Sequence, residues 1–295
     1  MKYYILILAL LLVPFLAFSQ KKKDNVALEK FNQGLAYYQS NKLDSALLIW
    51  ESMVEEEVGI GSDVYGSAFF NIPTIYWQLG DYERAKEWYK KIIDSELNDS
   101  DETGSLMEPH TNYKHKSALA LAGLYQIDSN YSEVLNWIHK ADTLYRYWGF
   151  EGSATSISKK QAYLLSWKIQ TLLRMSKKDE AIKAIIIELI CAGNLEDFFS
   201  LEEDEFINLI DVKPFRKSFD KGLADLTITQ VGEGQWEASF KVNKSKLTFP
   251  IRNKCPEKEL PHYWRFHRIE NGSTPQKKDI IEYIKERQFY KRLRK

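Results

Sequence analysis

"IYWQLGDYERAKEWYKKII", residues 75–93, has the pattern of two helices joined by a tight turn. Gly80 can adopt the left-handed conformation that ends a helix, and Asp81 can cap the next helix. In that second helix Ala85, Tyr89 and Ile92 recur at intervals of four and three residues, so they share one helix face. The stretch therefore predicts an antiparallel helix pair whose aromatic and small residues fill the gap, while its charged residues face solvent.

The same pattern occurs four times along the chain. Because one helix pair cannot bury its apolar face alone, stacked units would share a continuous core. Pro73 is expected to kink or restart the first helix of the second unit. An inserted loop from Asp94 to Tyr113 is expected to be mobile. The aligned small or β-branched residues of the second helices are Ala46, Ala85, Val134 and Ala181.

These repeats resemble the tetratricopeptide repeat family, most closely in residues 75–93. The resemblance covers about residues 27–195 and implies a mainly α fold, an α-solenoid of antiparallel helix pairs. Its units would span about 27–60, 66–99, 115–148 and 162–195, within a solenoid domain of residues 20–195. Residues 196–224 are expected to form capping helices, because similar segments close other bacterial proteins of this family.

After Asp225 the apolar pattern changes to a period of two, which is typical of strands. Strands are predicted at 226–231, 236–242, 246–251 and 262–269, followed by one helix from about Lys277. Residues 225–295 are therefore expected to form a small α+β domain, an antiparallel sheet plus a C-terminal helix. This domain resembles no family that we recognise.

The N-terminus, "MKYYILILALLLVPFLAFSQ", has the pattern of a signal peptide at residues 1–19, cleaved between Ser19 and Gln20. An uncleaved membrane anchor is the alternative, but the apolar run is short for a span and Pro14 interrupts it. Its end resembles export signals of Bacteroidetes-type bacteria. We therefore expect an exported protein, periplasmic or secreted.

The overall charge favours neither nucleic acid nor a membrane as a partner, because the chain has 41 basic and 41 acidic residues. Residues 276–295 hold eight basic and three acidic residues, so this basic C-terminal helix could contact an anionic envelope surface. A solvated helix face is the alternative. Export argues against a nucleic-acid partner.

The sequence lacks the usual motifs of catalysis: a phosphate loop, His-Glu-x-x-His, Gly-x-Ser-x-Gly and Cys-x-x-Cys. We therefore predict no enzyme activity, no cofactor and no metal. Cys255, His262 and His267 are the best metal candidate, but five-residue spacing on a strand sends the two histidines to opposite faces. Cys191 and Cys255 can be paired or free.

The resemblance places the functional surface on the concave face that the first helices line. Rings and amides at the family's groove positions suit an extended peptide. Alternatively, most of them pack on neighbouring helices or inserted loops. The predicted partner-binding residues are Asn32, Tyr38, Phe70, Asn71, Thr74, Trp77, Lys116, Gln126, Tyr163, Trp167 and Gln170.

One subtype of the family grips a peptide C-terminus with a clamp of cations and amides. Asn71 and Lys116 match this clamp, whereas Phe31, Leu35 and Ala120 replace a cation, an amide and a second cation. We therefore predict no binding of chaperone tails of that kind.

The leading hypothesis is a non-catalytic interaction scaffold of the bacterial envelope that binds a partner protein or peptide in its groove. A ligand-binding or enzymatic C-terminal domain, with the repeats recruiting substrate, is one alternative. A self-assembling structural component of the envelope is another. The sequence does not decide the oligomeric state.

Overall fold

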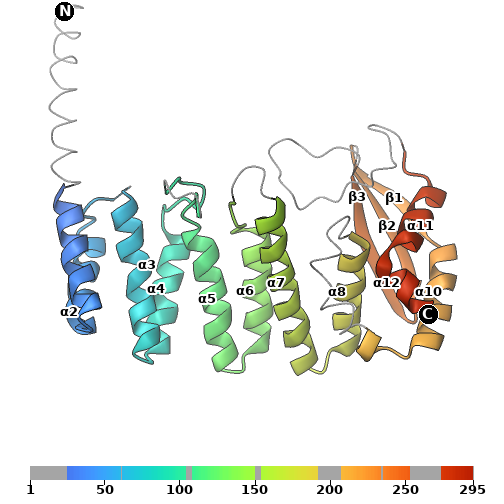
Figure 1. The fold of residues 1–295 in the computed structure, drawn as a ribbon, viewed down its shortest axis with the longest axis horizontal. Helices are drawn as coiled ribbons and strands as arrows, with labels where there is room; N and C mark the ends of the chain where they lie inside the picture. Colours follow the sequence, from blue (N-terminus) through green and yellow to red (C-terminus); the bar gives the residue numbers. More distant parts are fainter. Residues whose placement is uncertain are drawn as a thin grey trace, which may run out of the picture. The chain divides into compact units, whose positions relative to one another are not determined.

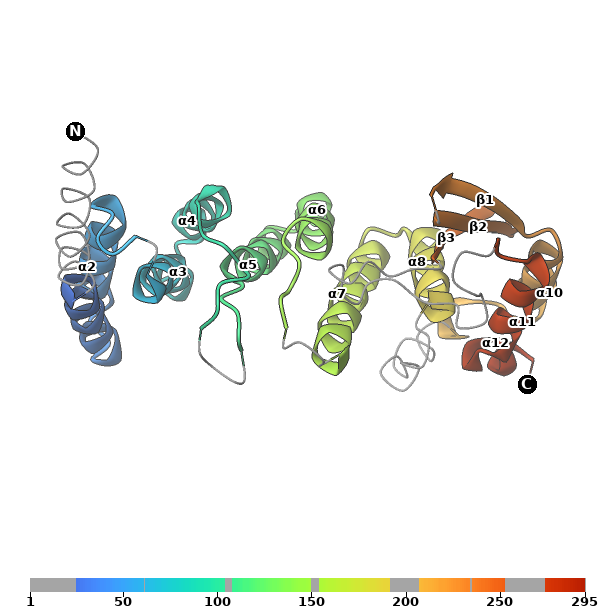
Figure 2. The same ribbon diagram turned by 90° about the horizontal axis from the view of Figure 1, so that it is seen from above.

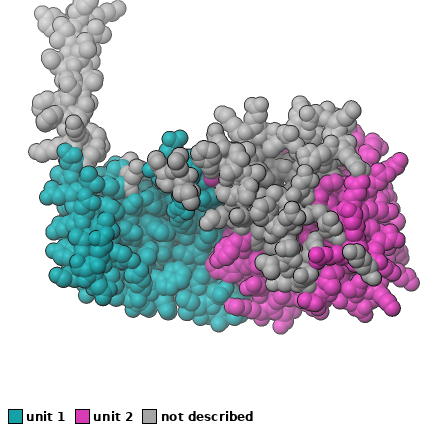
Figure 3. Space-filling model, viewed as in Figure 1, with its two compact units in different colours: residues 1–148 teal, residues 149–295 magenta. Residues whose placement is uncertain are grey.

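The computed structural model describes residues 25–60, 62–103, 108–149, 154–191, 207–233, 235–252 and 274–294. Helix pairs precede a small antiparallel sheet (Figure 1), which confirms the predicted fold class. The chain divides into two compact units, unit 1 (Met1–Trp148) and unit 2 (Gly149–Lys295), coloured separately in Figure 3. The predicted signal peptide lies outside the described residues. Among the helices described, none combines the length and apolarity needed to cross a membrane.

Unit 1 is built from helix pairs. Residues 25–39 are helical and are followed by α2 (Leu43–Glu55), α3 (Asp63–Gln78), α4 (Tyr82–Asp94), α5 (Tyr113–Ile127) and α6 (Tyr131–Thr143). Each of α3, α4 and α5 packs on the helices before and after it. Figure 2 shows α3 and α5 in one layer and α4 and α6 in a second. Unit 1 is thus a stack of antiparallel pairs, as predicted.

The turn between α3 and α4 forms as the sequence predicts. Gly80 has a φ of 78°, and the Asp81 carboxylate accepts a hydrogen bond of 3.1 Å from the backbone N–H of Arg84. The turn between α5 and α6 repeats this arrangement with Ser129, at a φ of 58°, in place of the glycine. Asn130 then caps α6. The same turn therefore forms with and without glycine.

Pro73 lies inside α3, which runs unbroken from Asp63 to Gln78. The alternative that the helix restarts at Pro73 is therefore wrong. The proline removes one helical hydrogen bond, but Ile72 and Ile75 beside it are fully buried and hold the helix against its neighbours.

The loop between α4 and α5 folds back on itself instead of remaining open. Glu102 and His110 form an antiparallel bridge, and the backbone N–H of Thr103 donates to the carbonyl oxygen of Pro109 at 2.8 Å. Figure 2 shows the described parts of this loop on the side of α3 and α5. Backbone hydrogen bonds thus join the described residues of this loop, and its mobility stays a prediction.

Unit 2 begins with the pair α7 (Ala154–Arg174) and α8 (Lys178–Cys191), followed by α10 (Val212–Ala224). The sheet has the order β1 (Thr227–Gly232), β2 (Gln235–Val242), β3 (Ser245–Arg252), with both pairs antiparallel. These strands match three predictions to within one residue. The fourth predicted strand, 262–269, lies outside the described residues, and so do Cys255, His262 and His267.

The core of unit 2 converges on the buried ring of Phe219 in α10. Its ring centroid lies 5.2 Å from that of Phe240 in β2, and 5.9 and 6.0 Å from those of Phe289 and Tyr290. Helix α10 belongs to the predicted capping segment 196–224 and packs against β2. The capping role of that segment stays a prediction.

The predicted C-terminal helix is divided into two parts, α11 (Lys277–Glu286) and α12 (Gln288–Leu293). Arg287 between them has an extended backbone, with φ −65° and ψ 146°, and is only 7 % exposed. The break redirects the chain, and Phe289 and Tyr290 then lie against Phe219. Tertiary packing has overridden a continuous helical pattern here.

Candidate protein-binding surface

The predicted binding residues of unit 1 lie on the first helix of each pair, that is, on residues 25–39, α3 and α5. Helices α3 and α5 share one layer (Figure 2). We call this set the first-helix face: Asn32, Tyr38, Phe70, Asn71, Thr74, Trp77, Lys116 and Gln126.

Three members of the first-helix face are engaged in packing. The Phe70 ring lies 5.7 Å from the Tyr113 ring and 5.9 Å from the Tyr89 ring, between centroids. The Thr74 hydroxyl donates to the carbonyl oxygen of Phe70 at 3.0 Å. Trp77 lies against Gly123 of α5, where an added Cβ would be 3.0 Å from its ring. Phe70 and Trp77 hold α3 to α4 and α5, whereas the Thr74 bond lies within α3.

Two amides of the face remain available. Asn32 is exposed and Asn71 is half-buried, and within the described part of the chain neither side chain has a hydrogen-bond partner. The Tyr38 hydroxyl, in contrast, accepts a hydrogen bond of 2.9 Å from Gln78. Gln126 is half-buried and also has a partner. A primary amide both donates and accepts, so Asn32 and Asn71 can bond a peptide backbone.

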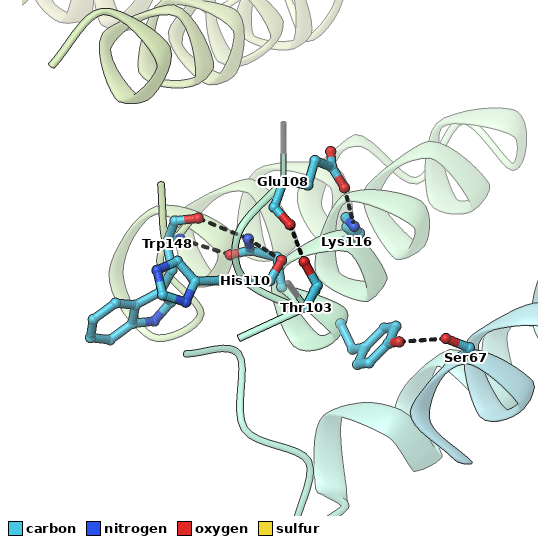
Figure 4. Close-up of polar contacts among 8 residues, drawn as sticks. Ser67, Thr103, Glu108, His110, Lys116 and Trp148 are labelled. Carbon is cyan, nitrogen blue, oxygen red and sulfur yellow. Dashed lines mark hydrogen bonds and ion pairs between the residues drawn. The ribbon is translucent and has the colours of Figure 1, made fainter. Parts of the chain in front are cut away.

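Lys116, the cation of the first-helix face, is already paired. Its ammonium lies 2.7 Å from the carboxylate of Glu108, which belongs to the loop before α5 (Figure 4). Exposed ion pairs contribute only about 0–1 kcal/mol. An anionic group of a partner could therefore displace Glu108 at little cost.

The loop that carries Glu108 is anchored at the start of α5. The two carboxylate oxygens of Asp99 accept hydrogen bonds from the backbone N–H groups of Lys114 and His115, at 2.6 and 2.8 Å. The buried side chain of Asn112 exchanges two hydrogen bonds with the backbone of Trp148, of 2.9 and 2.7 Å (Figure 4). Neither anchor was predicted from the sequence. An aspartate or asparagine before a helix suggests a cap, but nothing local identifies a partner 36 residues away.

A cavity of about 340 Å³ lies between the start of α3 and this loop. Carboxylates at its lining include Glu57, Glu96 and Asp101, beside the ring of Tyr65. Burial and the nearby Glu57 charge raise the pKa of Tyr65. A cavity with this lining suits a cationic side chain. Sequence reasoning missed it because its walls come from separate segments of the chain.

The remaining predicted residues belong to unit 2. Tyr163, Trp167 and Gln170 lie on α7 at spacings that place them on one helix face. Tyr163 is 56 % exposed, and its ring centroid lies 5.9 Å from that of Trp167. Whether they extend the first-helix face stays a prediction.

The basic C-terminal segment contributes some side chains to the core and exposes others on the surface. Phe289 and Tyr290 are buried, whereas Lys285 and Lys291 are exposed. The Tyr290 hydroxyl donates to Asp220 at 2.8 Å, and burial with this hydrogen bond raises its pKa to about 12. The exposed lysines are the part of this segment that could meet an anionic surface.

Among the described residues no group of three or more His, Cys, Asp or Glu side chains is arranged to hold a metal ion. His115 is not part of such a group: it is buried, and its Nδ1 lies 2.7 Å from the carbonyl oxygen of Tyr145.

Residues 67–99 match the family model of the tetratricopeptide repeat. The match covers most of α3, the turn at Gly80 and all of α4. A comparison of the chain with curated proteins gives no match. Tetratricopeptide repeats in general mediate binding between proteins, so the repeat supports a protein-interaction role for unit 1.

Proposed function

We propose that this protein is a non-catalytic scaffold of the bacterial envelope that binds a partner protein or peptide on the first-helix face. The observation that carries the proposal is the tetratricopeptide repeat at 67–99, within a stack of helix pairs whose face keeps the Asn71 amide without a partner. The absence of catalytic motifs from the sequence supports the non-catalytic part.

Each chemical group of the face would contribute differently. Asn32 and Asn71 would bond the backbone of an extended segment. Trp77 is held by its packing on Gly123, so its exposed edge offers apolar contact at low entropic cost. A basic side chain of the partner would enter the cavity lined by Glu57 and Asp101.

Site-specific photo-cross-linking in the native host tests this surface. A photoreactive residue in place of Asn71 should yield a defined adduct, and one in place of Glu87, which is exposed on α4, should not. Adducts at Glu87 alone, or identical adducts at both positions, would contradict the proposal.

Affinity for the partner found in this way gives a second test. Asn71→Ala should weaken binding about fivefold to tenfold, because one or two hydrogen bonds are lost. Glu87→Ala serves as the matched control and should leave affinity unchanged.

Export is the second part of the proposal. Removal of residues 1–19 would leave a mature chain that begins at Gln20. Mass spectrometry of the protein from fractionated cells should find this N-terminus in the envelope or the medium. Recovery of the chain with its first nineteen residues in the cytosol would contradict export.

The exposed lysines of α11 and α12 would add a contact with an anionic envelope surface. Such a contact depends on screened charges, so it should weaken as salt rises from 50 to about 300 mM. Replacement of Lys285 and Lys291 by glutamine should reduce this salt dependence. Unchanged envelope binding in that variant would rule the contact out.

A further inference from the structure

Unit 2 contains a pocket of about 570 Å³ at the edge of the sheet, where α10 leads into β1. It is separate from the first-helix face, because the described residues that line it all belong to unit 2. The polar side chains that line it are Ser218, Lys221, Asp225, Thr227, Ser239, Lys241, Asn243 and Lys246.

The strand register concentrates positive charge in this pocket. Phe240 and Val242 are buried, so Lys241 between them projects from the opposite face of β2. Lys246 of β3 is the direct cross-strand partner of Lys241. Their side chains therefore leave the same face of the sheet at neighbouring positions, and Lys221 of α10 also lines the pocket.

This arrangement is unfavourable without a counter-charge. Like charges directly opposite each other on antiparallel strands destabilise a sheet. Within the described part of the chain, neither Lys241 nor Lys246 forms an ion pair. Lys221 differs, because a cation in the last turn of α10 is stabilised by the helix dipole. Asp225 also lines the pocket but forms no ion pair with the two strand lysines, so a bound anion would add counter-charge next to them.

The floor of the pocket is polar and fixed. The hydroxyls of Thr227 and Ser239 lie 3.0 Å apart, and Ser239 is only 9 % exposed. A Cβ at Gly222 would collide with the carbonyl oxygen of Lys241, so the backbone of α10 lies directly on β2. Packed backbone and side chains therefore form the pocket, and the three lysines belong to its lining.

We propose that this pocket binds a small ligand that carries both a phosphate group and hydroxyl groups, such as a phosphorylated sugar or polyol. Lysine acts as a point charge suited to a multiply charged phosphate, whereas carboxylates are best held by the fork of arginine, and the described residues of the lining include no arginine. Asp225 can accept hydrogen bonds from ligand hydroxyls. The volume lies within the range usual for small-molecule sites.

Calorimetry with glucose 6-phosphate tests the proposal on the mature full-length chain. We expect saturable binding with one site, and no binding of glucose or of chloride at equal ionic strength. The double variant Lys241→Gln/Lys246→Gln should lose at least about tenfold in affinity. Lys178→Gln/Lys213→Gln, which removes the same charge from exposed positions elsewhere in unit 2, should bind like the wild type. Absence of binding, or equal losses in both double variants, would overturn the proposal.

A second arm distinguishes a free phosphate ester from a lipid headgroup. Vesicles of phosphatidylcholine with phosphatidic acid offer the phosphate at a surface, and plain phosphatidylcholine vesicles are the control. Binding to the acidic vesicles that is lost only in Lys241→Gln/Lys246→Gln would assign the pocket to a headgroup. Binding to glucose 6-phosphate alone would assign it to a soluble ligand, and binding to neither overturns the site.

Stability without ligand separates loss of the site from loss of the fold. Because the substitution removes repulsion between Lys241 and Lys246, the melting temperature of the double variant at low salt should equal or exceed that of the wild type. A large fall would show that these lysines support the fold, which would contradict the proposal.

Discussion

The two units bury their cores in different ways. In unit 1 large buried side chains are distributed along the chain, for example Trp50 in α2, Ile92 in α4 and Leu121 in α5, and each helix packs on its neighbours in sequence. In unit 2 the ring of Phe219 is packed against Phe240 and Phe289, which come from distant segments.

The two units should therefore be vulnerable to mutation at different kinds of position. A stack of helix pairs depends on nearest-neighbour contacts, so damage should remain local. A core that converges on one residue brings together segments far apart in sequence, so damage there should spread through the small sheet and its helices. Four predictions test the comparison.

The largest effect is expected from Phe219→Ala, which should destabilise unit 2 by about 3–5 kcal/mol. Hydrogen exchange should increase together in α10, β2 and α12. Trp50→Ala, a fully buried residue of unit 1, should increase exchange only in residues 25–39, α2 and α3. Loss of protection in α6 of the Trp50 variant would contradict the local character of unit 1.

Glycine-to-alanine changes compare close contacts in the two units. Gly222→Ala places a Cβ against the backbone of Lys241, which should cost about 1–3 kcal/mol or more. Gly123→Ala meets only the end of the Trp77 ring, at 3.0 Å, and gains about 1 kcal/mol in helix propensity. Urea denaturation should show a clear loss for the first and little change for the second. Equal losses would disprove the backbone contact.

Asp99→Asn tests the loop anchor of unit 1. Asparagine has one carbonyl oxygen for the two backbone N–H groups of Lys114 and His115, so about 1 kcal/mol should be lost. Exchange of these two amides should accelerate. Asp101→Asn, an exposed carboxylate of the same loop, is the control and should change stability by less than about 0.5 kcal/mol. An equal effect of both changes would point to net charge as the cause.

The smallest effect is expected from two tyrosines, one in each unit, because they change the stability only at high pH. Burial and a carboxylate hydrogen bond raise the pKa of Tyr76 and of Tyr290 from 10.0 to about 12. Above pH 10 the unfolded chain loses these protons while the folded chain keeps them, so stability falls as pH rises towards 12.

Denaturation midpoints measured from pH 9 to 11.5 should show this loss in both units. Tyr76→Phe should flatten the dependence of unit 1 and Tyr290→Phe that of unit 2. The pH dependence that remains in each variant would come from other tyrosines. If either change flattens the curve of the other unit, the assignment of these groups is wrong.

The same contrast explains what the sequence predicts. The pairs of unit 1 follow from local signals, such as Gly80 and Asp81, and the three strands follow from a period of two. The break at Arg287 could not be predicted, because only packing against Phe219 requires it. The predicted restart of the helix at Pro73 was also wrong, because the buried neighbours of Pro73 hold α3 intact despite the lost hydrogen bond.

For the binding surface, alignment with the repeat identifies which side chains lie on the first helices but not their neighbours. Phe70 and Trp77 are engaged by Tyr113 and Gly123, contacts that depend on how consecutive pairs stack. The pairing of Lys116 with Glu108 depends on a loop whose path no periodicity encodes. The lysine pocket of unit 2 becomes visible only when the register of β2 and β3 is known.

The bonds between Asn112 and Trp148 have a mechanical consequence. They join the residue before α5 to a residue beyond α6, and so tie the two ends of that helix pair together. Tension applied to the chain on either side of the pair would load these two hydrogen bonds first and would reach the helices only after they break. The two hydrogen bonds thus allow the pair α5–α6 to transmit a pull along the chain while its helices stay folded.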